Sequence, residues 1–288
     1  MTQETQLASM ERKTAMELFQ PTCVHLPTGV ELHIYQAGQG RDLLLLHGLT
    51  SAALCWSRLV RDLVGAGYRV TAVDGRGHGL SERSADYSLA AIAADAAALI
   101  QTVGLWKPTV IGHSMGGAQA LRLVSDHPEL VTSVIVEDPA IWEYAQSEAV
   151  IAASLIPWRT ALARCATGSV AELSAEKLRA SPHWSAEAAA LWATAQRQVD
   201  PDTLSYCDSN IQSVWEWLRP VQVPITVIHP RAGRGIIDDA MASALLAAMP
   251  LLRTAVMTNV EHNMHDDDPE IFFALVLEAL QRDERRDR

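Results

Sequence analysis

The chain has 288 residues, of which 49% are hydrophobic and 20% are charged, and its formal net charge at pH 7 is −11. This composition is typical of a globular protein that buries a large core, and the length suits one α/β unit with an insertion. The negative charge argues against nucleic acid as a partner, because phosphate groups would be repelled.

The two ends of the chain read as polar extensions. Residues 1–20 mix charged side chains with isolated apolar ones, so we expect an N-terminal extension and neither a signal peptide nor a membrane anchor. The charged residues 282–288 predict a frayed terminus. Four widely separated cysteines without a C-x-x-C pair indicate reduced thiols, a cytoplasmic location and no bound metal.

Short apolar runs alternate with helical patterns along the chain, which predicts a mostly parallel sheet with helices on both faces. The expected strands lie, in chain order, at 30–35, 42–46, 69–73, 109–111, 132–136, 224–228 and 254–257. The expected helices lie at 54–66, 88–103, 118–125, 239–249 and 269–281.

Residues 140–218 interrupt this alternation, because they show helical patterns and no convincing strand. A helical insertion before the last two strands is expected to cap the carboxyl edge of the sheet, where ligands bind in open α/β sheets. We therefore expect an extension at 1–20, a core built from 21–139 and 219–288, and a helical cap at 140–218.

A serine framed by glycines follows the strand at 109–111, in Gly112-His113-Ser114-Met115-Gly116-Gly117. This pattern predicts a nucleophile elbow, a sharp strand-to-helix turn that exposes the Ser114 hydroxyl. The N–H of Met115 would then lie at a helix N-terminus, where the partial positive charge suits a developing oxyanion.

Serine needs a base and a second oxyanion donor to act as a nucleophile. His262 is the preferred base, since it follows the last expected strand, and His265 is its rival. The N–H of Leu49 is the expected second donor, because Gly48 lets this loop approach the site closely. His47 is expected to brace the same loop.

These residues together resemble the α/β-hydrolase fold superfamily, in its branch with a helical cap. The resemblance spans residues 28–281 and implies a serine hydrolase without metal or organic cofactor. It rests on His47-Gly48, the stretch 74–81 (DGRGHGLS), the elbow at 112–117, and His262 followed by Asp268-Pro269-Glu270.

The sequence departs from this pattern at the acid of the triad. Most relatives carry an aspartate after the strand that corresponds to 224–228, and here it is missing. Haloalkane dehalogenases and some lactonases take the acid from the end of the preceding strand, where this chain has Glu137-Asp138. Glu137 is favoured, because it ends the strand and would lie near the imidazole of His262, and Asp138 is the alternative. If Glu137 and Asp138 only shape the entry to the cap, Asp238 or Asp239 must be the acid of the triad, although these two residues are expected to begin a helix.

The expected cap holds six of the eight tryptophans, and Trp142, Trp192 and Trp215, together with Gly48, are the predicted substrate-binding residues. No cluster of lysines or arginines there suits an anionic substrate, so we expect a medium-sized apolar or aromatic ester or lactone. The alternatives are hydrolysis of a C–C bond in a diketone and a small-molecule receptor on the same fold. Whether the protein is a monomer or a homodimer stays open.

Overall fold

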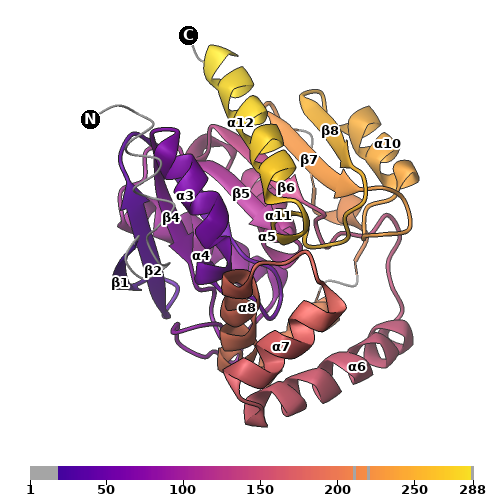
Figure 1. The fold of residues 1–288 in the computed structure, drawn as a ribbon. Coiled ribbons are helices and arrows are strands. Elements are labelled where there is room, and N and C mark those ends of the chain that lie inside the picture. Colours follow the sequence, from indigo (N-terminus) through magenta and orange to yellow (C-terminus); the bar gives the residue numbers. More distant parts are fainter. Residues whose placement is uncertain (1–18, 210–211, 219–220, 287–288) are drawn as a thin grey trace.

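An eight-stranded sheet forms the centre of the computed structural model, which describes residues 19–209, 212–218 and 221–286 (Figure 1). The strand order is β1-β2-β4-β3-β5-β6-β7-β8; β2 is antiparallel to both of its neighbours, β1 and β4, and the strands from β4 to β8 in this order pair in parallel. The strands are Gln20–His25 (β1), Glu31–Gly38 (β2), Arg41–Leu46 (β3), Tyr68–Val73 (β4), Thr109–His113 (β5), Ser133–Glu137 (β6), Ile225–Pro230 (β7) and Leu252–Met257 (β8).

The central strands are those that the apolar runs predicted. Residues 43–46 of β3 are at most 1% exposed, as expected for a parallel strand that is covered on both faces. Strand β1 was not predicted, because it contains Pro21 and is largely exposed at the edge of the sheet. Such a strand carries no hydrophobic periodicity, and its pairing with β2 holds it in place.

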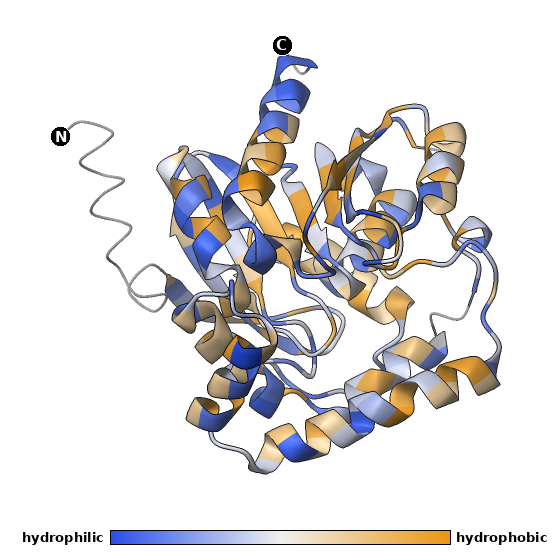
Figure 2. Ribbon diagram, turned by 45° about the vertical axis from the view of Figure 1, so that its right-hand side comes forward, coloured by the Kyte–Doolittle hydropathy of each residue, from blue (hydrophilic) through white to orange (hydrophobic). Residues whose placement is uncertain are grey.

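Helices cover both faces of the sheet, as the alternation predicted. One face packs against α3 (Ser57–Gly65) and α12 (Pro269–Arg286), which lie in front of the strands in Figure 1. The other face packs against α4 (Leu89–Thr102), α5 (Met115–Asp126) and α10 (Asp239–Ala248). Hydrophobic residues are concentrated in the strands between these layers (Figure 2).

The C-terminal end differs from the expected frayed segment at 282–288. Helix α12 continues to Arg286, and only residues 287–288 of this segment lie outside the described part. The reason is tertiary contact, because Arg282 donates a hydrogen bond of 2.7 Å to Thr226 and Asp283 is buried. The expected extension at 1–20 lies outside the described residues except for its last two.

A helical segment connects β6 to β7 and lies along one edge of the sheet (Figure 1). Serine side chains cap the first turns of α6, α7 and α8, through Ser147, Ser169 and Ser185. The elements of this segment are α6 (Glu148–Thr167), α7 (Val170–Ala180), α8 (Ala186–Gln198), η3 (Pro201–Ser205), α9 (Tyr206–Ser209) and η4 (Val214–Glu216).

The described residues of this segment include no strand, and their position is the one expected for a cap. The limits 140–218 of a separate cap domain stay a prediction. No helix in the described part of the chain has both the length and the apolar character needed to cross a bilayer.

Candidate active site

Ser114 lies at a sharp turn between β5 and α5, with φ 52° and ψ −112°. This backbone conformation is rare for a residue with a side chain and is the one that a nucleophile elbow requires. The turn is packed tightly against β3, because a Cβ atom on Gly116 would lie 2.2 Å from the carbonyl oxygen of Leu46. The local sequence therefore builds the turn, and β3 fixes its position.

Asp138 is the carboxylate that contacts His262. Its Oδ2 lies 2.5 Å from Nδ1 of His262, and the side chain is completely buried. The same carboxylate accepts hydrogen bonds from the backbone N–H groups of Ile236, at 2.9 and 3.0 Å, and Ile237, at 2.8 Å. The loop after β7, which lacks the usual aspartate, thus folds onto a carboxylate supplied by the end of β6.

The expected contact between Glu137 and His262 needs correction. The Glu137 carboxylate lies 2.7 and 2.9 Å from Nδ1 of His265 and also accepts the His265 backbone N–H at 2.9 Å. Side chains alternate between the two faces of a strand, so Glu137 shares the face of Ile135. That face packs against α12, and the short helix α11 (Met264–Asp267), which carries His265, lies beside it.

The buried pair of Glu137 and His265 is charged. Burial alone lowers the pKa of His265, but the carboxylates of Glu137 and Asp266 outweigh it and raise this pKa to about 9. The imidazole is therefore protonated at neutral pH and forms an ion pair with Glu137. Burial raises the pKa of Asp266, whose Oδ2 lies 3.4 Å from Nε2 of His265, to about 6.

His113, the last residue of β5, ties the loop of His262 to the elbow. Burial lowers its pKa well below the usual value, so the ring is neutral, and Nε2 lies 3.0 Å from the carbonyl oxygen of His262. A neutral ring in this position donates its Nε2–H to that carbonyl. Polar atoms of His113, Glu137 and His265 lie within 4.8 Å of one another, a spacing that one metal ion could bridge. They are already engaged in these hydrogen bonds, so we assign no metal to them.

The residues expected to supply the oxyanion donors, Leu49 and Met115, line one cavity together with Ser114. Neither the N–H of Leu49 nor that of Met115 has an acceptor among the described residues. Gly48 is needed for the approach of this loop, because a Cβ atom there would lie 2.7 Å from Nδ1 of His113. His47 braces the loop, since its Nδ1 lies 2.8 Å from the Gly48 carbonyl oxygen.

Two cavities meet at Ser114 and His262, and Leu49 and Trp158 line both. The first, here called the apolar arm, measures about 380 Å³ and is lined among others by Trp142, Val150, Ile151, Leu155, Tyr206 and Ile236. The second, here called the polar arm, measures about 350 Å³ and is lined among others by Thr50, Cys55, Trp192, Gln196, Asn263 and Asp266. A larger cavity of about 460 Å³ opens at the amino ends of β3 and β5, away from the elbow.

Not all predicted residues are brought to this site. Trp142 and Trp192 line the two arms, whereas Trp215 lines neither and is 37% exposed. Asp238 accepts a hydrogen bond of 2.8 Å from Met241 N–H and begins α10 with Asp239, as predicted. Asp266, which the sequence pattern did not single out, also lines the polar arm.

The comparisons with known proteins agree with this architecture. Residues 43–217 match the family model described as the alpha/beta hydrolase fold, so the chain belongs to that family of hydrolases. This finding confirms the predicted fold class and the resemblance.

Among curated proteins, the chain is 29% identical to N-formylmaleamate deformylase of Pseudomonas putida, over 85% of this chain and 91% of the relative. It is 24% identical to 2-(acetamidomethylene)succinate hydrolase of Mesorhizobium japonicum, over 84% of this chain and 88% of the relative. The crystal structure of E-2-(acetamidomethylene)succinate hydrolase superposes with a TM-score of 0.76 and 22% identity, over 91% of this chain and 99% of that one. This likeness shows the fold.

Proposed function

We propose that the protein is a serine hydrolase that cleaves a carboxylic ester or lactone through an acyl-enzyme on Ser114. The observation that carries the proposal is the contact between Asp138 and His262, at the wall of a cavity that also contains Ser114. Serine, histidine and carboxylate are the three groups that acyl transfer through a serine requires.

In the proposed reaction, His262 takes the proton of Ser114 at Nε2, while Asp138 holds the Nδ1–H and stabilises the imidazolium. The Ser114 Oγ attacks the carbonyl carbon, and the N–H groups of Leu49 and Met115 donate to the oxyanion. His262 then protonates the leaving alkoxide. Water attacks the acyl-enzyme by the same steps and releases the acid, or a hydroxy acid from a lactone.

The lining of the two arms supports an uncharged substrate of medium size. The described residues that line them include tryptophans and aliphatic side chains but no lysine or arginine. His265, which lines the polar arm, already has its charge paired with Glu137, so a carboxylate in either arm would lack a free cationic partner. An apolar or aromatic acyl group fits the apolar arm best.

The test is the intact mass of the protein after treatment with a fluorophosphonate probe, compared with that of Ser114→Ala. We expect one adduct on the wild type and none on the variant. A folded wild type without an adduct would contradict the proposal and favour the receptor. A stable adduct with a natural ester but no turnover would also favour a receptor.

A second candidate is hydrolysis of an N-acyl bond, and the relatives named above favour it. One is a deformylase that spans almost the whole chain. The two candidates are separated by matched substrates, an aryl ester and the corresponding N-formyl or N-acetyl amide, with identification of the products. The same analysis detects C–C cleavage, because only that reaction releases a fragment that was bonded through carbon.

A further inference from the structure

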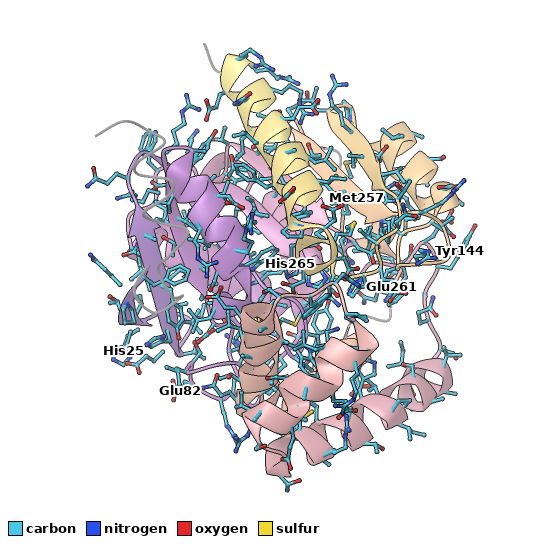
Figure 3. The ribbon with its side chains drawn as sticks, in the orientation of Figure 1. His25, Glu82, Tyr144, Met257, Glu261 and His265 are labelled. Carbon is cyan, nitrogen blue, oxygen red and sulfur yellow. The ribbon has the colours of Figure 1, made fainter. Side chains whose placement is uncertain are left out.

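Two imidazole–carboxylate pairs lie next to each other at the end of β6. Asp138 contacts His262, and its neighbour Glu137 contacts His265, which lies three residues further along the chain, in α11. Figure 3 labels His265 between the sheet and the helical segment. The proposed reaction uses only the first pair, although the second is equally buried on its carboxylate side.

Three contacts with two strands hold the loop of His262, and the second pair makes two of them. Glu137, from β6, accepts both the side-chain and the backbone N–H of His265. His113, from β5, donates to the carbonyl oxygen of His262. The ring of His113 stands between the other two, at centroid distances of 4.6 Å from His262 and 5.1 Å from His265.

Several carboxylates surround His265, and that of Glu137 makes the shortest contact with its ring, at 2.7 Å. Glu137 faces it from β6 and His113, which is neutral, from β5, while Asp266 and Asp267 lie on its own helix. Its neighbours Trp56 and Phe272 are uncharged. Removing the imidazolium alone would leave the Glu137 carboxylate unpaired beside Asp138 and His262.

Resting on the proposed function, we propose that Glu137 and His265 form a positioning pair that sets both the orientation and the proton affinity of the catalytic base His262. In this proposal, neither Glu137 nor His265 contacts the substrate carbonyl. The pair keeps the His262 ring against Asp138, and its paired charges place no uncompensated charge of Glu137 beside the ring that accepts the Ser114 proton.

The experiment measures the rate of fluorophosphonate labelling of Ser114 against pH in wild type, His265→Gln, Glu137→Gln and the double variant. In His265→Gln we expect the midpoint of the acid limb of the labelling-rate profile to rise by roughly half a pH unit or more. The reason is that the unpaired Glu137 carboxylate favours protonated His262. In the double variant the charge is neutral again, so the limb should return to its wild-type position.

The effect on the orientation of the His262 ring is measured by the limiting labelling rate, which is the plateau of the same pH profiles. Loosening the loop should lower the limiting labelling rate of Glu137→Gln on the order of tenfold, with the half-saturating probe concentration unchanged. His183→Gln is the matched control, because His183 forms an exposed pair with Asp267 at 2.9 Å, and its profile should equal that of the wild type.

Identical profiles for all variants, or a shift in the double variant equal to that in His265→Gln, would overturn the positioning pair. A wild type without labelling would contradict the proposed function instead. In that case, titration of the His262 imidazole by NMR, assigned with His262→Gln, still tests the pair through its shift in His265→Gln. If His265→Gln does not fold, the limiting labelling rate of Glu137→Gln decides, and a rate equal to those of the wild type and His183→Gln overturns the positioning pair.

Discussion

Glu137 and Asp138 are neighbours in the chain, yet their carboxylates bind different histidines, His265 and His262 respectively. Glu137 ends β6 with its side chain on one face of the sheet, and Asp138 follows with a positive φ of 39°. The backbone turn between them separates the two side chains. One carboxylate thereby reaches the proposed catalytic base, and the other anchors the loop that carries this base.

Replacement of Asp138 by Asn should reduce turnover on the order of 10⁴-fold, because the acid that fixes the His262 tautomer is lost. The measurement is kcat with an aryl ester, together with the thermal unfolding of the variant. Asp238→Asn is the control, and we expect activity near that of the wild type, since Asn caps a helix as well as Asp. A large loss in Asp238→Asn with full activity in Asp138→Asn would assign the acid to the other loop.

The stability of the fold should fall at alkaline pH because of His265. Its folded-state pKa of about 9 lies above the value of about 6.5 that an unfolded chain has. Protonation therefore stabilises the fold fully below about pH 6.5, and this contribution is lost as the pH rises through about 9. The difference in pKa corresponds to about 3 kcal/mol of unfolding free energy.

Urea unfolding at pH 6.5 and pH 9.5 measures this dependence, and the double variant His265→Gln with Glu137→Gln is the comparison, because it removes the imidazole without leaving the buried Glu137 carboxylate unpaired. The wild type should lose about 3 kcal/mol more than the variant between these two pH values. Equal losses in both proteins would show that His265 is not protonated in the folded state.

Gly48→Ala should impair catalysis without abolishing folding. The added methyl group would lie 2.7 Å from Nδ1 of His113 and 3.3 Å from Cβ of Ser114, so the loop with the Leu49 N–H must move. Loss of one oxyanion donor reduces kcat by about 10²- to 10³-fold. Gly75→Ala offers a matched control with only an ordinary contact of 3.5 Å, to His47, and should keep most of the activity.

Trp142 and Trp215 should respond differently to truncation. Trp142 lines the apolar arm and Trp215 lines neither arm, although both belong to the helical segment. Trp142→Ala should lower kcat/KM for long-chain or aromatic esters by about tenfold relative to acetate esters, because packing against the acyl group is lost. Trp215→Ala should leave this ratio unchanged. A chain-length series of aryl esters measures it, and equal effects would place the acyl group elsewhere.

Much of the fold follows from local sequence patterns. The continuous apolar run in 43–46 predicted a buried parallel strand, and β3 is that strand. The glycines around Ser114 predicted the elbow, because few side chains tolerate such a turn. Strand β1 and the full length of α12 could not be predicted in this way, since an edge pairing and a contact between Arg282 and Thr226 stabilise them.

The residues of the site also fall into those that local sequence determines and those that depend on tertiary contacts. The sequence alone determined the elbow at Ser114, the Gly48 loop and the pair of candidate carboxylates, because each depends on residues that are adjacent in the chain. Which carboxylate meets His262 was decided only by the tertiary structure. The end of β6 at Glu137 and the backbone turn at Asp138 separate the two carboxylates, but no local pattern shows from which side the distant loop of His262 approaches. That side is set by the packing of α11 and α12 against the sheet.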